Sequence, residues 1–325
     1  MPYYPPRPEE SSDHLSSDCS VHRRNILRRT LICASVLLIV YGAVRLIGYG
    51  SDLIASRQTA SELREIAAET DDPEESALPA EPATELPVRE AAISPAPPAD
   101  ETEEVPVRSD VLPVVNYPNG YELVSRIQKI RKKSEYVIGW ITMEELDEPV
   151  AQKDNSFFLN HDATGKRNGN GALFMDEGTS LLTRPYTILV YGHNMKSGAM
   201  FGNLRKYEEF SYCYQHRVFQ FDTLYEEGQY AIFAVETISL TPGKGKYVNL
   251  IDLESTDRET RRNALQALEN HSLHNAMLDV NEEDQILLLV TCTGDDDERL
   301  IVAARRLRDG EREDHLTMKT GKSMQ

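Results

Sequence analysis

The sequence predicts a mainly β domain, a barrel or a sandwich, carried behind a single membrane-spanning helix. Three observations lead to this fold class: one uninterrupted apolar segment near the N-terminus, a Pro- and Glu-rich stretch after it, and a succession of short β-prone runs separated by turn residues. The chain has 325 residues and a net charge of −18, which suits one sizeable domain with extra segments. This acidic balance argues against a nucleic-acid partner, because phosphate binding relies on Lys and Arg.

The apolar segment predicts a membrane anchor at residues 30–50. Its core, LICASVLLIVYGAV, is uncharged, and with RLIGYG the segment reaches about 20 residues, the length that a helix needs to cross a bilayer. Arg23, Arg24, Arg28 and Arg29 lie just before it, and acidic sequence follows. The positive-inside rule therefore places residues 1–29 in the cytoplasm and the remainder outside the cell membrane. A cleaved signal peptide is the rival interpretation, disfavoured because no small-x-small cleavage site follows at once.

Residues 51–113 are predicted to form an acidic, Pro-rich extracellular linker. Its first part, SDLIASRQTASELREIAAET, is compatible with a short helix leaving the membrane. From Asp71 the sequence is rich in Pro, Glu and Ala and lacks sustained apolar periodicity, so it cannot bury enough surface to offset chain entropy. We expect a spacer that holds a folded domain, residues 114–310, away from the membrane. A polar tail, residues 311–325, follows that domain.

The folded domain alternates β-prone runs with turn residues. A helix is predicted first, within 119–134, where Leu123, Ile127 and Ile130 recur at helical spacing. The β-prone runs are EYVIGWITM, NSFFLN (155–160), GALFMD, YTILVYG, HRVFQFDTL, QYAIFAVETISL, QILLLVTC and ERLIVAARRL. Their number and shortness favour a barrel or sandwich over a parallel α/β sheet.

One late helix is predicted at residues 256–271, TDRETRRNALQALENH. Thr256 and Glu259 have the spacing of a capping box, in which each side chain satisfies a free backbone N–H of the first turn. The last two β-prone runs then close the domain.

A lone cysteine ends one of these two runs. Cys292 closes the first and Arg299 opens the second, so pairing of the two strands would bring both side chains to one end of the sheet. An arginine in that position stabilises a thiolate, or donates hydrogen bonds to an oxyanion formed when sulfur attacks a carbonyl. The alternative is an inert buried thiol. The four cysteines are too few and scattered for a disulfide framework or a metal site with CxxC spacing.

A nucleophilic thiol needs a proton acceptor, and His193 is the best candidate. The stretch YTILVYGHNM places it directly after a buried strand and a glycine, the strand-end position that Cys292 also has. The other histidines have ordinary interpretations as cytoplasmic, tail, helix-end or turn residues: His14, His22, His315, His271, His274, His161 and His216.

These motifs together resemble the class B sortases, the membrane-anchored cysteine transpeptidases of Gram-positive bacteria. The matching residues are YGHNM at 191–195, MF at 200–201, LRKY at 204–207, His216, and TC at 291–292 before an arginine followed by LIV. Supporting matches are GWI at 139–141, PVAQKDNSFFL at 149–159 and GALFMD at 171–176. The resemblance covers about residues 117–308, and the anchor and spacer agree with it.

The resemblance implies a closed β-barrel of about eight strands, with an N-terminal helix and one extra late helix. Cys292 would attack the carbonyl carbon of the scissile Thr–X bond in a C-terminal sorting signal and form a thioester. His193 would protonate the leaving amine and then deprotonate the incoming amine, while Arg299 would bind substrate and stabilise the oxyanion. Thr291 and Asn194 are the expected substrate-binding residues, although Asn194 could instead orient His193 or shape a turn. No cofactor and no metal are implied.

The implied partners are secreted proteins with a C-terminal NPxTx-like sorting signal and an amine acceptor, either lipid II or peptidoglycan, or a pilin lysine. The sequence departs from the family pattern T-L-x-T-C at Leu288, which replaces the first threonine. It also has three aspartates, 295–297, whose negative charge would oppose thiolate formation. A solvated turn is favoured for these aspartates over a calcium site, because their spacing does not alternate.

Two other classes of function stay open. A cysteine hydrolase of the papain-like or NlpC type would use the same residue types, but those enzymes place the cysteine before the histidine, and chain order alone does not decide. A non-catalytic surface module would use the domain for binding only.

Overall fold

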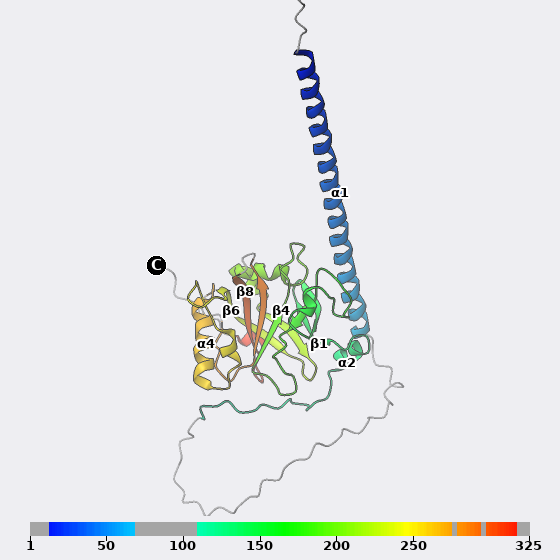
Figure 1. Cartoon of the computed structure of the whole chain (residues 1–325). Coiled ribbons are helices and arrows are strands. Elements are labelled where there is room, and N and C mark those ends of the chain that lie inside the picture. Colours follow the sequence, from blue (N-terminus) through cyan, green and yellow to red (C-terminus); the bar gives the residue numbers. More distant parts are fainter. Residues whose placement is uncertain (1–12, 69–108, 275–277, 294–296, 317–325) are drawn as a thin grey trace, which may run out of the picture. The chain divides into compact units, whose positions relative to one another are not determined.

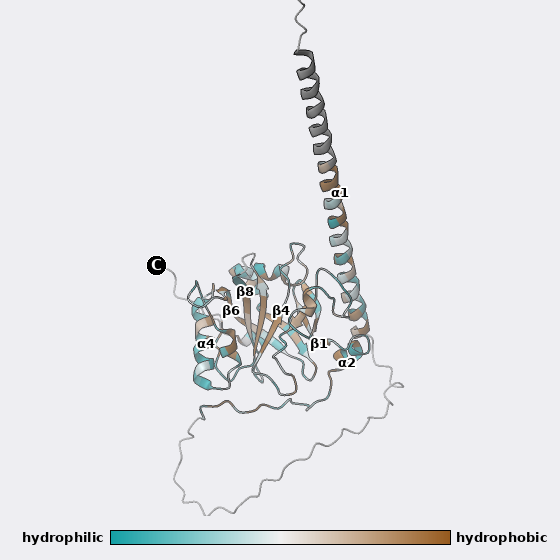
Figure 2. Ribbon diagram, viewed as in Figure 1, coloured by the Kyte–Doolittle hydropathy of each residue, from teal (hydrophilic) through white to brown (hydrophobic). Residues whose placement is uncertain are grey.

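The structure, a computed structural model, describes residues 13–68, 109–274, 278–293 and 297–316. It divides the chain into two compact units, Met1–Ala55 and Ser56–Gln325. Helix α1 (Asp13–Ala68) is continuous. Its part from Ala34 is long enough to cross a membrane and contains an 18-residue stretch with a mean hydropathy of 1.5, apolar enough to do so. Brown segments on α1 in Figure 2 mark apolar residues. Large apolar side chains on this helix are exposed, Leu38 by 71%. The predicted single apolar N-terminal helix is therefore present.

Eight strands close into a barrel in the order β1-β2-β3-β4-β7-β8-β6-β5 (Figure 1). Their bounds are β1 Val137–Met143, β2 Leu146–Ala151, β3 Leu173–Met175, β4 Thr187–Tyr191, β5 Val218–Thr223, β6 Gln229–Ser239, β7 Ile286–Cys292 and β8 Glu298–Arg306. Two pairs, β2 with β3 and β4 with β7, are parallel, and the others are antiparallel. The predicted closed barrel of about eight strands is confirmed.

One predicted strand is wrong and one strand was not predicted. Residues 155–160 form no strand, because the Asp154 carboxylate accepts from the Phe157 amide and starts a 3-10 turn, η1 (Phe157–Leu159). Strand β2 is not predicted, because its sequence, LDEPVA, lacks an alternating apolar pattern. Its proline is tolerated because β3 pairs only with the two residues after it, which leaves Pro149 beside an open edge.

The helices of the domain are short. Helix α2 (Ser125–Arg131) is confined to the centre of the predicted 119–134 segment, and α4 (Arg258–His271) matches the predicted late helix. The others are η2 (Phe201–Glu208), α3 (Phe210–Gln215), η3 (Leu250–Glu254) and η4 (Glu313–His315). The predicted capping box is wrong by one residue, since Asp257 caps α4 by accepting from the Thr260 amide at 2.8 Å.

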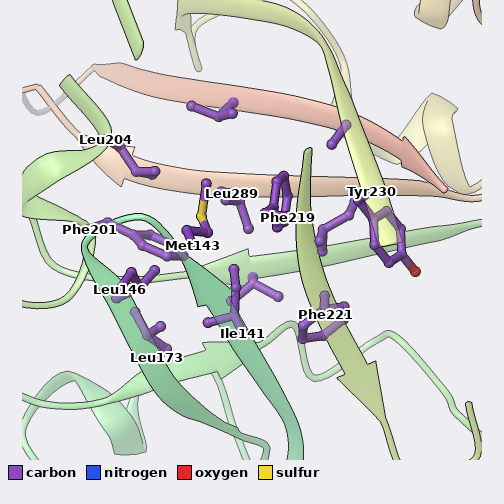
Figure 3. Packing of buried hydrophobic residues seen from close by; sticks show 14 of the residues in the cluster. Ile141, Met143, Leu146, Leu173, Phe201, Leu204, Phe219, Phe221, Tyr230 and Leu289 are labelled. Carbon is purple, nitrogen blue, oxygen red and sulfur yellow. The ribbon is translucent and has the colours of Figure 1, made fainter. Parts of the chain in front are cut away.

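Buried apolar side chains form three clusters. The barrel interior holds the largest, with Ile141, Phe221 and Leu289 at its centre (Figure 3). A second cluster lies on the outer face of β4, β7, β8 and β6, where α4 and η3 cover the sheet. A third gathers around Trp140 and includes residues of α2 and η1. Helices α2 and α4 thus lie on opposite sides of the barrel (Figure 1).

The last turns of α1, inside the predicted linker range 51–113, pack on this third cluster. Leu63 is fully buried beside Ile127, Ile130 and Trp140. Polar contacts flank it: Thr59 donates to Asp162 at 3.2 Å, Lys133 pairs with Glu62, and Arg64 pairs with Asp147. Residues 56–68 are consequently a part of the folded domain.

Candidate active site

The three predicted catalytic residues lie in one row across three neighbouring strands. Strand β4 pairs in parallel with β7, with Tyr191 opposite Val290, so His193 and Cys292 both lie two residues beyond that pair. Strand β8 pairs antiparallel with β7 and sets Arg299 directly opposite Cys292. Strands in a sheet are about 4.8 Å apart, so the register brings the three backbone positions together.

This row lies on the outer face of the barrel, where the second apolar cluster ends. Val290 and Ile301 belong to that cluster, and Cys292 and Arg299 follow at a spacing of two residues, which returns each side chain to the same face. The Cys292 side chain is exposed, whereas His193 and Arg299 are half-buried. The thiol is therefore open to a large substrate while its two neighbours are partly shielded from water.

A tight turn after β4 holds His193. Its carbonyl accepts hydrogen bonds from the amides of Met195 and Phe201, at 3.1 and 3.0 Å. Gly192 is required before it, because a Cβ at that position would lie 2.5 Å from Leu173 and 2.7 Å from Phe201. The glycine in the predicted strand–Gly–His pattern thus has a steric reason.

One ring nitrogen of His193 is already committed. Its Nε2 lies 2.9 Å from the Leu159 carbonyl oxygen, which can only accept, so Nε2 carries a hydrogen. The imidazole also packs on the loop at Gly171, where an added Cβ would come within 3.1 Å of the ring. Nδ1 is therefore the nitrogen left to exchange a proton with the thiol or with substrate.

Side chains bind the backbone on both sides of Cys292. The Thr291 hydroxyl donates to the Gly192 carbonyl at 2.7 Å and is 2% exposed. The Asn194 amide donates to the carbonyl of Cys292 at 2.7 Å, and Arg205 donates to the carbonyl of Thr293 at 2.7 Å. Asn194 thus bonds the strand that carries the cysteine, an arrangement that neither predicted alternative, orienting His193 or shaping a turn, had included.

The acidic loop before Arg299 is partly neutralised. Asp297 pairs with Lys244 at 3.0 Å, and its carbonyl accepts from the Leu240 amide at 2.8 Å. Asp295 and Asp296 lie outside the described residues. Lys244 therefore offsets one of the charges that were expected to oppose thiolate formation.

The remaining candidates are accounted for by packing. Burial raises the pKa of the Cys213 thiol to about 12, so this second cysteine of the domain is unreactive at neutral pH. Four other histidines contact their surroundings as follows: His161 stacks on Phe157, His216 lies 3.4 Å from Glu144, His271 lies 3.7 Å from Glu236, and His274 bonds the Tyr207 carbonyl. Among the described residues no three Cys, His, Asp or Glu side chains gather as a metal site would need.

Two residues that contact the site were not predicted to do so. Arg205 lies inside the LRKY motif, whose spacing indicated family resemblance but no role. Leu159 contributes only its backbone carbonyl, so the residue type at position 159 could not have indicated this contact.

Comparison with known proteins agrees with this geometry. A family model for the sortase domain matches residues 141–307. Sortase B of Listeria monocytogenes is 29% identical over 179 residues, covering 54% of this chain and 70% of that protein. Sortase B of Staphylococcus aureus is 27% identical over 192 residues, covering 56% and 75%. The crystal structure of sortase B from Bacillus anthracis has 27% identity and a TM-score of 0.52, covering 60% of this chain and 89% of that one.

The family match spans more than half of the chain, and it includes His193, Cys292 and Arg299. The chain belongs to the sortase family. Its relatives place it with the class B sortases, as the residue motifs had indicated.

Proposed function

We propose that the chain is a cysteine transpeptidase that cleaves a C-terminal sorting signal after threonine and transfers the protein to an amine. The observation that supports this most is the row of His193, Cys292 and Arg299 across β4, β7 and β8. A thiol, a proton carrier and a fixed cation are the groups that acyl transfer through a thioester requires.

In the first half-reaction the Cys292 thiol gives its proton to His193 Nδ1, and the sulfur attacks the carbonyl carbon of the Thr–X bond. The carbonyl π electrons move onto oxygen, and Arg299 stabilises the resulting oxyanion. The C–N bond then breaks, His193 gives its Nδ1 proton to the leaving amine, and a thioester to Cys292 remains. Nε2 keeps its hydrogen on the Leu159 carbonyl throughout, which fixes the ring.

In the second half-reaction an amine attacks the thioester. His193 takes the proton that the amine loses, the C–S bond breaks, and the thiolate leaves as the new amide forms. We propose an NPxTx-like sorting signal as donor, and as acceptor an amine of cell-wall precursor or of pilin. Helix α1 is apolar enough to hold the enzyme at the cell membrane, with residues 1–29 cytoplasmic and the barrel outside.

The test uses the full chain in detergent micelles, a panel of NPxTx and LPxTG peptides, and triglycine as amine acceptor. Mass spectrometry should find the N-terminal peptide fragment on Cys292 and its transfer to triglycine. Cys292→Ala should abolish both products. Cys213→Ala is the matched control, because that thiol is buried, and it should retain both.

Three results would contradict the proposal. No adduct with any peptide from folded protein would favour a binding module. An adduct that persists in Cys292→Ala would place the nucleophile elsewhere. Release of the free acid at high triglycine, with no amide formed, would indicate a hydrolase.

A further inference from the structure

The parallel ladder between β4 and β7 ends before it reaches the nucleophile. Its last backbone contact is the Gly192 amide on the Val290 carbonyl, at 3.2 Å. In a regular parallel ladder the next bond from this strand would join the amide of residue 194 to the carbonyl of Cys292. The chain instead turns back after His193, and an isolated bridge pairs Asn194 with Met200.

A side chain takes the place of that missing bond. The Asn194 Nδ2 donates to the Cys292 carbonyl at 2.7 Å, across 98 residues of sequence. The following carbonyl, that of Thr293, accepts from Arg205 Nη2 at 2.7 Å, and Arg205 comes from η2, the element that follows the turn. Two successive carbonyls, at the nucleophile and just after it, are thus held by donors from the segment that also carries His193.

We propose that Asn194 and Arg205 are positioning residues, which fix the backbone of Cys292 relative to His193 by binding the carbonyls of Cys292 and Thr293. This inference rests on the proposed transpeptidase function. It replaces the expected contact of Asn194 with substrate. The consequence for catalysis is geometric: a displacement of the nucleophile by about 1 Å is enough to lower a rate by up to 100-fold.

The test compares steady-state transfer of the accepted peptide to triglycine by full-length variants in detergent micelles. Asn194→Ala and Arg205→Ala should each lower kcat about tenfold or more and change KM by less than about threefold. Asn194→Asp, which keeps the shape but has no N–H to donate, should be as slow as Asn194→Ala. Arg205→Lys, which keeps a donor, should recover part of the kcat that Arg205→Ala loses.

A neighbouring residue supplies the matched control. Lys206 lies beside Arg205 on η2 but pairs with Glu145, so Lys206→Ala should retain the wild-type kcat. Thermal unfolding should show each variant within about 4 °C of wild type, since one exposed hydrogen bond contributes little to stability. A rise in KM at unchanged kcat would overturn the inference, as would a kcat within twofold of wild type. An Arg205→Lys variant no faster than Arg205→Ala would overturn it too.

Alkylation of Cys292 by iodoacetamide tests the clamp, the two hydrogen bonds from Asn194 and Arg205 to the carbonyls of Cys292 and Thr293, without a peptide. Loss of either donor should change the alkylation rate by at least threefold, because the thiol is displaced relative to its neighbours. Failure of the wild-type chain to transfer any peptide would refute the proposed function, whereas unchanged alkylation in both alanine variants would refute the clamp.

Discussion

Glu236 is a buried carboxylate without a hydrogen-bonding partner among the described residues. It lies on β6, is fully buried, and neither oxygen receives a hydrogen bond. Burial raises its pKa to about 8, against the opposing positive charge of Lys246. The His271 Nδ1 lies 3.7 Å away, at the end of α4. Between pH 4.5 and 8 the folded state therefore holds a proton that the unfolded chain has lost.

This carboxyl should make the domain less stable as the pH rises. A raised pKa in the folded state contributes stability that is complete below the unfolded pKa and is lost as the pH approaches 8. Wild type should lose about 2–3 kcal/mol between about pH 5.5 and 8 that Glu236→Gln keeps, because glutamine cannot ionise. Urea unfolding at the two pH values measures the difference. Glu227→Gln, which changes an exposed glutamate just before β6, is the control. Parallel pH curves for wild type and Glu236→Gln would contradict the prediction.

At the residue scale, the sequence predicts the positions of chemically reactive side chains better than those of the residues that hold them in place. The sequence predicted that Cys292 and Arg299 meet because each lies at the end of a predicted strand, and the strand register confirms that these two positions lie opposite each other and near that of His193. Asn194 and Arg205 were not assigned their contacts, because each bonds a carbonyl about 90 residues away that any amino acid could supply. Every residue has a backbone carbonyl, so the amino-acid type at the acceptor position gives no indication of such a contact.

Among the elements, the end of α1 makes the least expected contact. Its Leu63 fills the cluster around Trp140, so a chain lacking residues 56–68 would expose that cluster. Leu63→Ala should destabilise the domain by about 2–4 kcal/mol, through lost apolar contact and the cavity left behind. Trp140 is the only tryptophan of the chain, so its fluorescence during urea unfolding of full-length protein in detergent reports on this cluster.

The exposed Glu65 on the same turn offers the control, because Glu65→Ala removes a side chain without opening a cavity. It should unfold at the wild-type urea concentration. An unfolding midpoint for Leu63→Ala equal to that of wild type would mean that the helix adds nothing to the domain.

Element prediction succeeded where periodicity and burial agree. Strands β7 and β8 are buried along most of their length, and their continuous apolar sequence therefore predicts them. Strand β2 has acidic residues and a proline because one of its edges is only partly paired, so its pattern resembles that of a loop. The aromatic run near Phe157 has the pattern of a strand. It forms a turn instead, because the Asp154 carboxylate accepts a hydrogen bond from the Phe157 amide.

At the scale of the whole molecule, the cysteines report on the topology across the membrane. Cys19 precedes the predicted membrane anchor, residues 30–50, and Cys33 lies within it. Cys213 is buried, and Cys292 is exposed on the barrel. In the proposed orientation, with the barrel outside the cell, a membrane-impermeant maleimide added to intact cells should label wild type and not Cys292→Ala. Permeabilised cells should add labelling at Cys19, and labelling of Cys19 in intact cells would show the opposite orientation.

The barrel closes through its last strand, and this sets when the enzyme can first act. Strand β8 lies between β7 and β6, so neither neighbour is paired on that side until β8 has been made. Contacts such as Asn194 with Cys292 span 98 residues, so they cannot form before both residues have been made. During synthesis on the ribosome, His193 is made long before Cys292. The two are not aligned until β7 pairs with β4. Synthesis itself therefore delays closure of the barrel, and with it assembly of the row of three residues, until β8, Glu298–Arg306, has been made.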